Sequence, residues 1–411
     1  MSRRQQSRND SSIDSITESL KSLMATGLRY AGDLSGLTFL DETFLREHGP
    51  EQVLHHMLST KSYILTTSTL VEKNQDAYNH PEMKSFVKVG QGQCGTVWAL
   101  TGTTMVLKVP NDGKKDQLYN DYCQHAAVEE AFRSTFSVFR RHINLPSCQT
   151  WLGPHNELFW KDHAKFLPKG FQSTYGIVST RIFPVPLPVC SAIVDACAPR
   201  SVKNNKESFL AQPENKDCLI RIYLGRRQER SSMNAFRLRN FDMTVNEMEY
   251  SRLDTHLYAE SMGHALAIMH WKAGVDGNDV EFVFGSSPEI RLRPTAAELA
   301  CLTADQAERL SSELDFKHRS LGIWLLDFDQ CQRFEEGPQG VKQLERAFYF
   351  NDPYYPRPAS KDPKDRVLWT TFKDSYLEAS AEFTDSKMPQ QFIDAVEAEG
   401  IKRSSGRSLF G

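Results

Sequence analysis

Paired cysteines with metal-ligand spacing are missing from this chain. The eight cysteines form no CxxC pair, and no two histidines have the spacing of a zinc finger. This scatter indicates reduced thiols in an intracellular protein. We therefore expect no structural zinc and no metal site built from cysteine. The cysteines are at positions 94, 123, 148, 190, 197, 218, 301 and 331.

Long apolar runs and an excess of positive charge are also missing. No stretch approaches the length of a membrane span, and the polar start "MSRRQQSRNDSSIDS" lacks the apolar core of a signal peptide. The net charge of −3 excludes a chain that is cationic throughout, although it leaves room for a local basic face. We expect a soluble cytoplasmic protein with no membrane partner and no DNA partner.

What is present suits a large globular protein. The 411 residues are 40% apolar and 25% charged, which allows one large or two medium domains. We predict an α+β fold of two lobes, an antiparallel-sheet N-lobe over 85–228 and a mainly helical C-lobe over 229–402. A disordered tail (1–12) and a helical extension (13–84) precede them, a polar loop insertion covers about 196–217, and a flexible tail (403–411) ends the chain.

Short β-rich segments with turn residues between them define the predicted N-lobe. We expect three consecutive antiparallel strands over 85–90, 95–100 and 104–110, then a helix over 115–141. The segments 175–186 and 218–225 are predicted as the fourth and fifth strands. In the C-lobe we predict strands over 280–285 and 321–331 and helices over 254–271, 295–315, 367–383 and 389–400.

The segment "VKVGQGQCGTVW" is the first candidate site. Gly90, Gly92 and Gly95 let backbone N–H groups approach phosphate oxygens, and they lie between two predicted strands, as in a kinase-type hairpin. Lys108, on the third strand, is placed to meet a nucleotide phosphate. We expect Glu129, or its neighbour Glu130, to orient Lys108 through an ion pair. The alternative interpretation is a hairpin that binds no ligand, with Lys108 as an ordinary surface lysine.

Carboxylates gather in "HWKAGVDGNDVEFVFG". Asp276, Asp279 and Glu281 repel one another unless a cation or a proton offsets them. They could bind Mg²⁺, act as a general base, or hold a guanidinium through paired hydrogen bonds. A solvated acidic turn is the competing interpretation.

Two further segments carry charge at informative positions. Asp327 ends the buried strand "LGIWLLDFDQC", where a carboxylate can hold a metal or simply cap the next turn. Arginines at 221, 226, 227, 230, 237 and 239 would attract a phosphate backbone if they shared one face. A solvated face is the alternative.

The glycine loop, Lys108 and the "DFD" turn together resemble the protein-kinase-like fold over about 85–385. Asp276 and Glu281 keep the five-residue spacing of that fold's catalytic Asp and metal-binding Asn. The departures are that "HRD" and "APE" are missing and that Glu281 replaces the Asn.

A closer resemblance is to a fungal family labelled DUF3669 zinc-finger-like proteins. It is carried by "ALAIMHWKAGVDGNDVEFVFG", "LGIWLLDFDQC" and "NDPYYPRP". Fungal proteins that share these motifs include arginine-containing cyclodipeptide synthases. The resemblance implies joining arginine and a second amino acid, both delivered as aminoacyl-tRNA, into a diketopiperazine, without a bound cofactor.

Three classes therefore remain open from the sequence. They are a tRNA-dependent cyclodipeptide synthase, which we favour, an ATP- and Mg²⁺-dependent kinase-like phosphotransferase, and a nucleotide-binding pseudokinase. In the favoured class, Asp276 or Glu281 would be the general base or the guanidinium ligand, with Asp279 in support. Lys108 would hold a phosphate or carboxylate.

Overall fold

The computed structural model describes residues 40–227, 236–290, 300, 303–304 and 314–406. The predicted tail over 1–12, the start of the extension and most of the predicted helix over 295–315 lie outside these residues. The fold is α+β, as expected, and contains two sheets. Among the described helices, none is both long and apolar enough to span a membrane.

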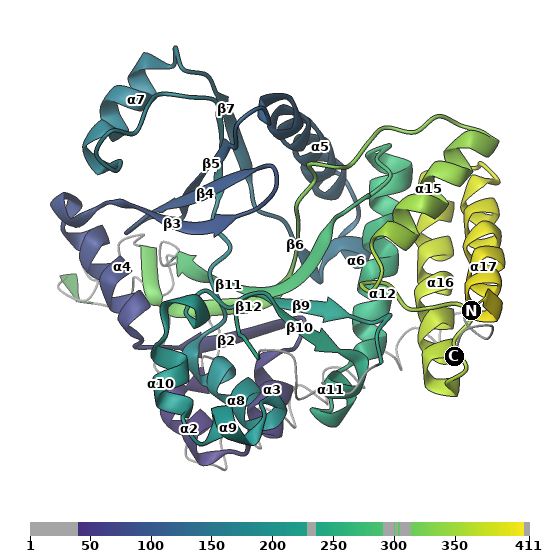
Figure 1. The fold of residues 1–411 in the computed structure, drawn as a ribbon, viewed down its shortest axis with the longest axis horizontal. Coiled ribbons are helices and arrows are strands. Elements are labelled where there is room, and N and C mark those ends of the chain that lie inside the picture. Colours follow the sequence, from purple (N-terminus) through teal and green to yellow (C-terminus); the bar gives the residue numbers. More distant parts are fainter. Residues whose placement is uncertain (1–39, 228–235, 291–299, 301–302, 305–313, 407–411) are drawn as a thin grey trace.

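The smaller sheet is antiparallel throughout and carries the glycine hairpin. All three consecutive strands predicted from the sequence are confirmed, and α5 (Lys115–Arg133) follows them and packs against the sheet (Figure 1). The strand order is β3 (Phe86–Gln91), β4 (Gly95–Leu100), β5 (Met105–Pro110), β8 (Gly176–Thr180) and β7 (Cys148–Leu152).

The fifth strand of the smaller sheet is β7, so the prediction of 218–225 for this place is wrong. That segment forms β9 in the larger sheet, because the chain crosses over after β8 and Phe183 pairs with Ser286 there. The strand β7 escaped prediction because it is short and polar, with Gln149 and Thr150 exposed.

The larger sheet is mixed and lies at the centre of the molecule (Figure 1). Its long hairpin pairs β11 with β12. The order is β1 (Leu40–Asp41), β2 (Lys61–Leu65), β12 (Leu314–Leu326), β11 (Glu281–Ile290), β9 (Ile220–Tyr223) and β10 (Phe241–Thr244), and β6 (Ile143–Asn144) also pairs with β12.

Three predicted segments differ from the structure. The described part of the extension, 40–84, includes the strand β2, which pairs with β12, so this segment is not purely helical. The predicted loop over 196–217 contains helical turns, because Phe209 and Leu210 pack against the core. The first residues of the predicted tail over 403–411 still belong to the last helix.

Helices surround both sheets (Figure 1). The predicted helices over 254–271, 367–383 and 389–400 are confirmed as α12 with the π-helix η4, α16 and α17. The bounds are α2 (Glu42–Glu47), α3 (Pro50–Met57), α4 (Thr69–Asn79), α6 (Ser137–Arg140), α7 (Glu157–His163), α8 (Leu187–Cys197), α9 (Arg200–Lys203), α10 (Lys206–Ala211), α11 (Val245–Tyr250), α12 (Thr255–Ala267), η4 (Ile268–Lys272), α15 (Pro338–Phe350), α16 (Pro363–Phe383) and α17 (Met388–Gly406), with 3₁₀ turns η1 (Pro81–Met83), η2 (Ala164–Phe166) and η3 (Pro213–Asn215).

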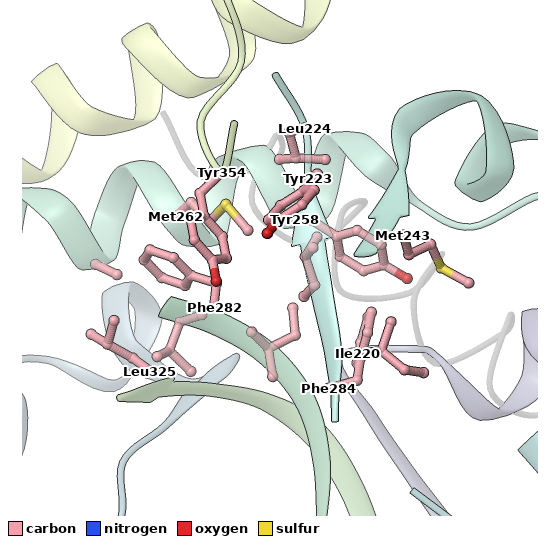
Figure 2. Close-up of a cluster of buried hydrophobic side chains, with 14 of the residues drawn as sticks. Ile220, Tyr223, Leu224, Met243, Tyr258, Met262, Phe282, Phe284, Leu325 and Tyr354 are labelled. Atoms are coloured by element: carbon pink, nitrogen blue, oxygen red, sulfur yellow. The ribbon is translucent and has the colours of Figure 1, made fainter. Parts of the chain in front are cut away.

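The main core lies between the larger sheet and α12. Figure 2 shows Phe282 and Phe284 of β11 on the side of Tyr258 and Met262, and the rings of Tyr258 and Phe284 are 5.4 Å apart. Alternate residues of a strand point to opposite faces of the sheet, so Glu281 and Val283 point away from α12. This alternation positions Glu281 for the site described next.

Candidate functional site

Lys108 is the centre of a charged cluster where β5 meets the end of β12. Its Nζ atom lies 2.6 Å from Oδ2 of Asp121 and 3.2 Å from Oδ1 of Asp327. Burial alone would lower the pKa of Lys108, but the charges of Asp121 and Asp327 outweigh it and hold the pKa well above its ordinary value. Lys108 is therefore a permanent cation that joins the two sheets.

The partner of Lys108 on the following helix is Asp121, and the predicted pairing with Glu129 is wrong. Glu129 lies two turns further along α5, where its Oε2 accepts a hydrogen bond from the Cys148 N–H at 2.8 Å. Asp121 is buried on the same stripe of α5 as Leu118 and His125. The sequence signal for Asp121 is weak, because the polar residues Gln124 and His125 share this buried stripe.

The acidic turn after β12 is fixed to α5. Asp327 has a left-handed backbone (φ 68°), which is uncommon outside glycine. The next N–H, of Phe328, donates to Asp121 Oδ1, and Gln117 donates to Asp329 Oδ2 at 2.9 Å. These bonds place the Asp327 and Asp329 carboxylates beside Lys108.

Asp279 joins this cluster from the loop before β11. Its backbone is also left-handed (φ 62°), and its N–H donates to the Asn351 side chain. Burial, followed by the charges of Asp327 and Asp329, raises the pKa of the Asp279 carboxyl to about 6. Gln330 donates a hydrogen bond to Asp279 Oδ2, which orients the carboxylate.

Glu281, the first residue of β11, forms a paired contact with Arg221 of β9. Arg221 Nη2 contacts Glu281 Oε1, and Nε lies 3.3 Å from Oε2. Burial raises the pKa of Glu281, although the Arg221 cation opposes this. The sequence suggested that these acids could hold a guanidinium, and the guanidinium that Glu281 holds belongs to the chain itself.

Asp276 is built into the loop rather than directed at the cluster. Its Oδ1 accepts from the N–H groups of Asn278 (3.1 Å) and Gln332 (2.9 Å), and its Oδ2 accepts from Gln343 (2.8 Å). The residue is 4% exposed. Of the three acids grouped by sequence, Asp279 and Glu281 therefore join Asp327, while Asp276 supports their loop.

The glycine hairpin is held rigidly next to Lys108. Asn111 donates to the carbonyl groups of Gly92 and Gln93, both at 2.9 Å. A Cβ at Gly95 would lie 2.4 Å from the Val109 carbonyl oxygen, whereas at Gly90 and Gly92 it would meet only ordinary contacts. Close packing of β4 on β5 thus requires Gly95, while the other two glycines leave room above the hairpin.

The arginine-rich stretch does not form a free basic face within its described residues. Besides Arg221, Arg227 pairs with Glu249 at 2.8 Å and with Asp365 at 2.7 Å. Arg226 lies over the Tyr223 ring, and Arg239 donates to the Val89 carbonyl of the glycine hairpin. Arg237 is exposed, and Arg230 lies outside the described residues.

A polar groove of about 600 Å³ adjoins the loop that carries Asp279. Its lining includes Asp276 and Asn278 from that loop and the basic side chains of Arg333, Lys342 and Arg346. Across the part of the chain that the structure covers, no three His, Cys, Asp or Glu side chains are grouped closely enough to hold a metal ion. The seven described cysteines are free thiols.

The comparison with known families matches one segment of the chain. The family model DUF3669, described as a zinc finger protein, matches residues 323–388. This segment contains Asp327, Asp329 and Gln330 of the cluster, together with Asn351, which holds Asp279. The resemblance to the family is supported over this segment, whereas no curated protein matches the chain.

Proposed function

We propose that this protein is an arginine-containing cyclodipeptide synthase of fungal secondary metabolism. It would join arginine and a second amino acid, both delivered by aminoacyl-tRNA, into a diketopiperazine. The observation that carries the proposal is the excess of carboxylates around Lys108 and Arg221. This charge favours a cationic substrate such as an arginyl group over a free polyphosphate.

The five carboxylates of the cluster outnumber its two cations. Two of them are already committed, since Asp121 is paired with Lys108 and Glu281 with Arg221. Asp327 contacts Lys108 as well, at the longer distance of 3.2 Å. Within the described residues no cation pairs with Asp279 or Asp329, and their negative charge suits the guanidinium of an arginyl substrate.

Asp279 is the residue that we assign as the general base. An α-ammonium group has a pKa of roughly 7.7–8.0, so a carboxylate with a pKa of about 6 can accept its proton near neutral pH. Asp276 and Glu281, which the sequence favoured, are bound by protein donors instead. Gln330 would keep the Asp279 carboxylate in one orientation.

The reaction needs no further activation, because an aminoacyl-tRNA is an ester. The amine of one aminoacyl group attacks the ester carbonyl of the other, the new C–N bond forms, and the C–O bond to the tRNA ribose breaks. Asp279 takes the proton from the amine and can return it to the departing ribose oxygen. A second, intramolecular attack by the remaining amine closes the ring and releases the second tRNA.

Delivery by tRNA implies that the enzyme works in the cytoplasm, because aminoacyl-tRNA is made there. Under this proposal the kinase-like arrangement of hairpin, lysine and acidic turn acts as a rigid holder for the reacting groups. The two glycines that leave space above the hairpin, Gly90 and Gly92, would face the 3′ end of a tRNA. Lys108 would stabilise a carboxyl or phosphate oxygen.

The test is product formation from defined components. The purified protein is incubated with separately prepared arginyl-tRNA and a pool of other aminoacyl-tRNAs, and arginine-containing cyclodipeptides are measured by mass spectrometry. We expect product without ATP and loss of product after RNase treatment. Asp279→Asn should be inactive, while the exposed Asp385→Asn should match the wild type. RNase-resistant product would contradict delivery by tRNA.

A kinase-like phosphotransferase is the second candidate, and one observation favours it. The Lys108–Asp121 pair beside Asp327, next to a glycine hairpin, is the arrangement that positions nucleotide phosphates in kinase-like proteins. In that case Lys108 would meet the phosphates, and Asp327 would hold Mg²⁺. ATP consumption that depends on an added acceptor, without any cyclodipeptide, would favour this candidate, and ATP binding without turnover would favour a pseudokinase.

A further inference from the structure

Residues 181–183 join the two sheets at a place remote in sequence from the acidic cluster. The Arg181 N–H donates to the Thr104 carbonyl on the side of the smaller sheet, and Phe183 exchanges backbone hydrogen bonds with Ser286 of β11. The Phe183 ring is fully buried there. Two guanidinium groups lie against this ring, that of Arg181 at 4.5 Å and that of Arg319 at 4.7 Å from its centre.

Both arginines are buried, and within the described residues one carboxylate forms an ion pair with Arg181 while none pairs with Arg319. Arg181 is 5% exposed and Arg319 is 2% exposed. Asp217, a half-buried residue, is the carboxylate of this ion pair, with its Oδ1 3.6 Å from Arg181 Nη2. Arg319 donates to the Ser286 hydroxyl at 2.5 Å, while its buried Nε finds no acceptor within the part of the chain that the structure describes.

Two buried cations that share one carboxylate are costly unless a further anion accompanies them. A buried charge needs an opposite charge and filled hydrogen bonds, and breaking a buried pair typically costs several kcal/mol. Contact with an aromatic ring offsets only part of this. Burial, and then the charge of the neighbouring Arg181, lower the pKa of Arg319 to about 9. The lowered pKa reflects the free-energy cost of burying two like charges close together.

We propose that Arg181 and Arg319 bind a small oxyanion of the phosphate class beside Phe183. Two planar guanidinium groups offer paired N–H donors, which match the tetrahedral oxygens of phosphate better than they match a halide. The Arg319 Nε supplies a donor that still needs an acceptor. The anion would brace the connection between the sheets, and the site shares no residue with the Asp279 cluster.

Thermal unfolding in matched anions tests the proposal. The full chain is unfolded in chloride, in inorganic phosphate and in glycerol 3-phosphate at equal ionic strength. We expect a saturable rise in Tm with phosphate, on the order of 1–3 °C at ten times Kd. A response to both phosphates indicates room for a phosphomonoester, and a response to inorganic phosphate alone indicates a closed site for the free ion.

Substitution of Arg319 separates binding from general salt effects. Arg319→Met keeps the length of the side chain but removes the charge, so it should abolish the phosphate response and leave the Tm in chloride equal or higher. Arg133→Met, at an exposed arginine in the last turn of α5, should respond as the wild type does. If Arg319→Met does not fold, Arg319→Lys serves instead, and it should weaken the phosphate response at least ten-fold in apparent Kd.

Two results would contradict the proposed phosphate site. A wild-type protein whose Tm is the same in phosphate and chloride has no such site. A phosphate response that survives in both Arg319 variants comes from another part of the surface. Neither result affects the cyclodipeptide assay, which tests different residues.

Discussion

The acidity of Asp279 leads to a prediction about the pH dependence of the proposed reaction. A general base works only as the carboxylate, so the rate should fall as the pH drops below about 6. Asp279→Asn should lower product formation by roughly 10²-fold or more and remove this acidic limb. The measurement is kcat/KM against pH with preformed aminoacyl-tRNA.

Asp385→Asn is the control for this experiment, because Asp385 is exposed between α16 and α17. A fully active Asp279→Asn variant, or an unchanged acidic limb in that variant, would remove Asp279 from the role of base.

The same pKa predicts how Asp279 affects stability. Its pKa is about 6 in the folded protein against an ordinary 3.8, so the folded state holds this proton more tightly than the unfolded state. The stabilisation from this group is therefore present at low pH and is lost as the pH rises through about 6. Asp279→Asn should gain more stability relative to wild type at pH 8 than at pH 4, as measured by urea unfolding. An equal difference at both pH values would show that the pKa of Asp279 is ordinary.

Substitution of Asp276 should lower the stability of the protein, because its carboxylate is bound by three protein donors. An amide at this position places an NH₂ group against one of the donors that now bind the carboxylate, from Asn278, Gln332 or Gln343. We expect Asp276→Asn to lower the free energy of unfolding by about 1–3 kcal/mol. Unchanged stability together with lost activity would restore Asp276 as a candidate catalytic residue.

These residues show what the sequence could and could not reveal about the site. The sequence singled out Lys108, Asp327 and the acidic segment, because charges next to apolar strands are unusual, and the structure brings Lys108, Asp327 and Asp279 together. It could not rank Asp276, Asp279 and Glu281, since the ranking depends on donors such as Gln343 and Arg221 that are distant in sequence. Asp121 was overlooked because its role appears only once α5 is packed on β5.

The glycine hairpin allows a prediction with a control inside the same element. Gly95→Ala places a Cβ 2.4 Å from the backbone oxygen of Val109, so β4 and β5 must separate locally. We expect a loss of about 1–3 kcal/mol in the free energy of unfolding. Gly92→Ala, whose Cβ would come no closer than 4.0 Å to a neighbour, should remain within about 0.5 kcal/mol of the wild type.

The two glycine variants also report on function. If the hairpin contacts a ligand, Gly92→Ala should raise KM without a change in stability. Equal destabilisation by both substitutions would contradict the packing that we describe for Gly95.

Strands with strong apolar character were predictable, and those defined by their partners were not. The segments that form β3, β4 and β5 stand out because valine, leucine and tryptophan alternate with turns. The strand β9 was also predicted, but its sheet was not, because that depends on the crossover at Phe183. No local pattern records which of two sheets a short strand will join.

At the scale of the whole molecule, the segment before the hairpin is part of the central sheet. Ile64 of β2 is fully buried and pairs with Arg319 of β12. Ile64→Ala should lower the free energy of unfolding by about 2–4 kcal/mol in a single cooperative transition. Lys61→Ala, at an exposed position of the same strand, should change it little. A separate early transition for Ile64→Ala would instead indicate an independent extension.

The strand β12 has a consequence for genetics. One edge of this strand accepts the N-terminal strand β2, and its end delivers Asp327 to Lys108. Loss of the pairing between β2 and β12 would therefore displace β12 and, with it, Asp327. If the proposed activity is correct, a screen for its loss should recover alleles in residues 61–65 alongside those at Asp327, although that segment supplies none of the five carboxylates or two cations of the cluster.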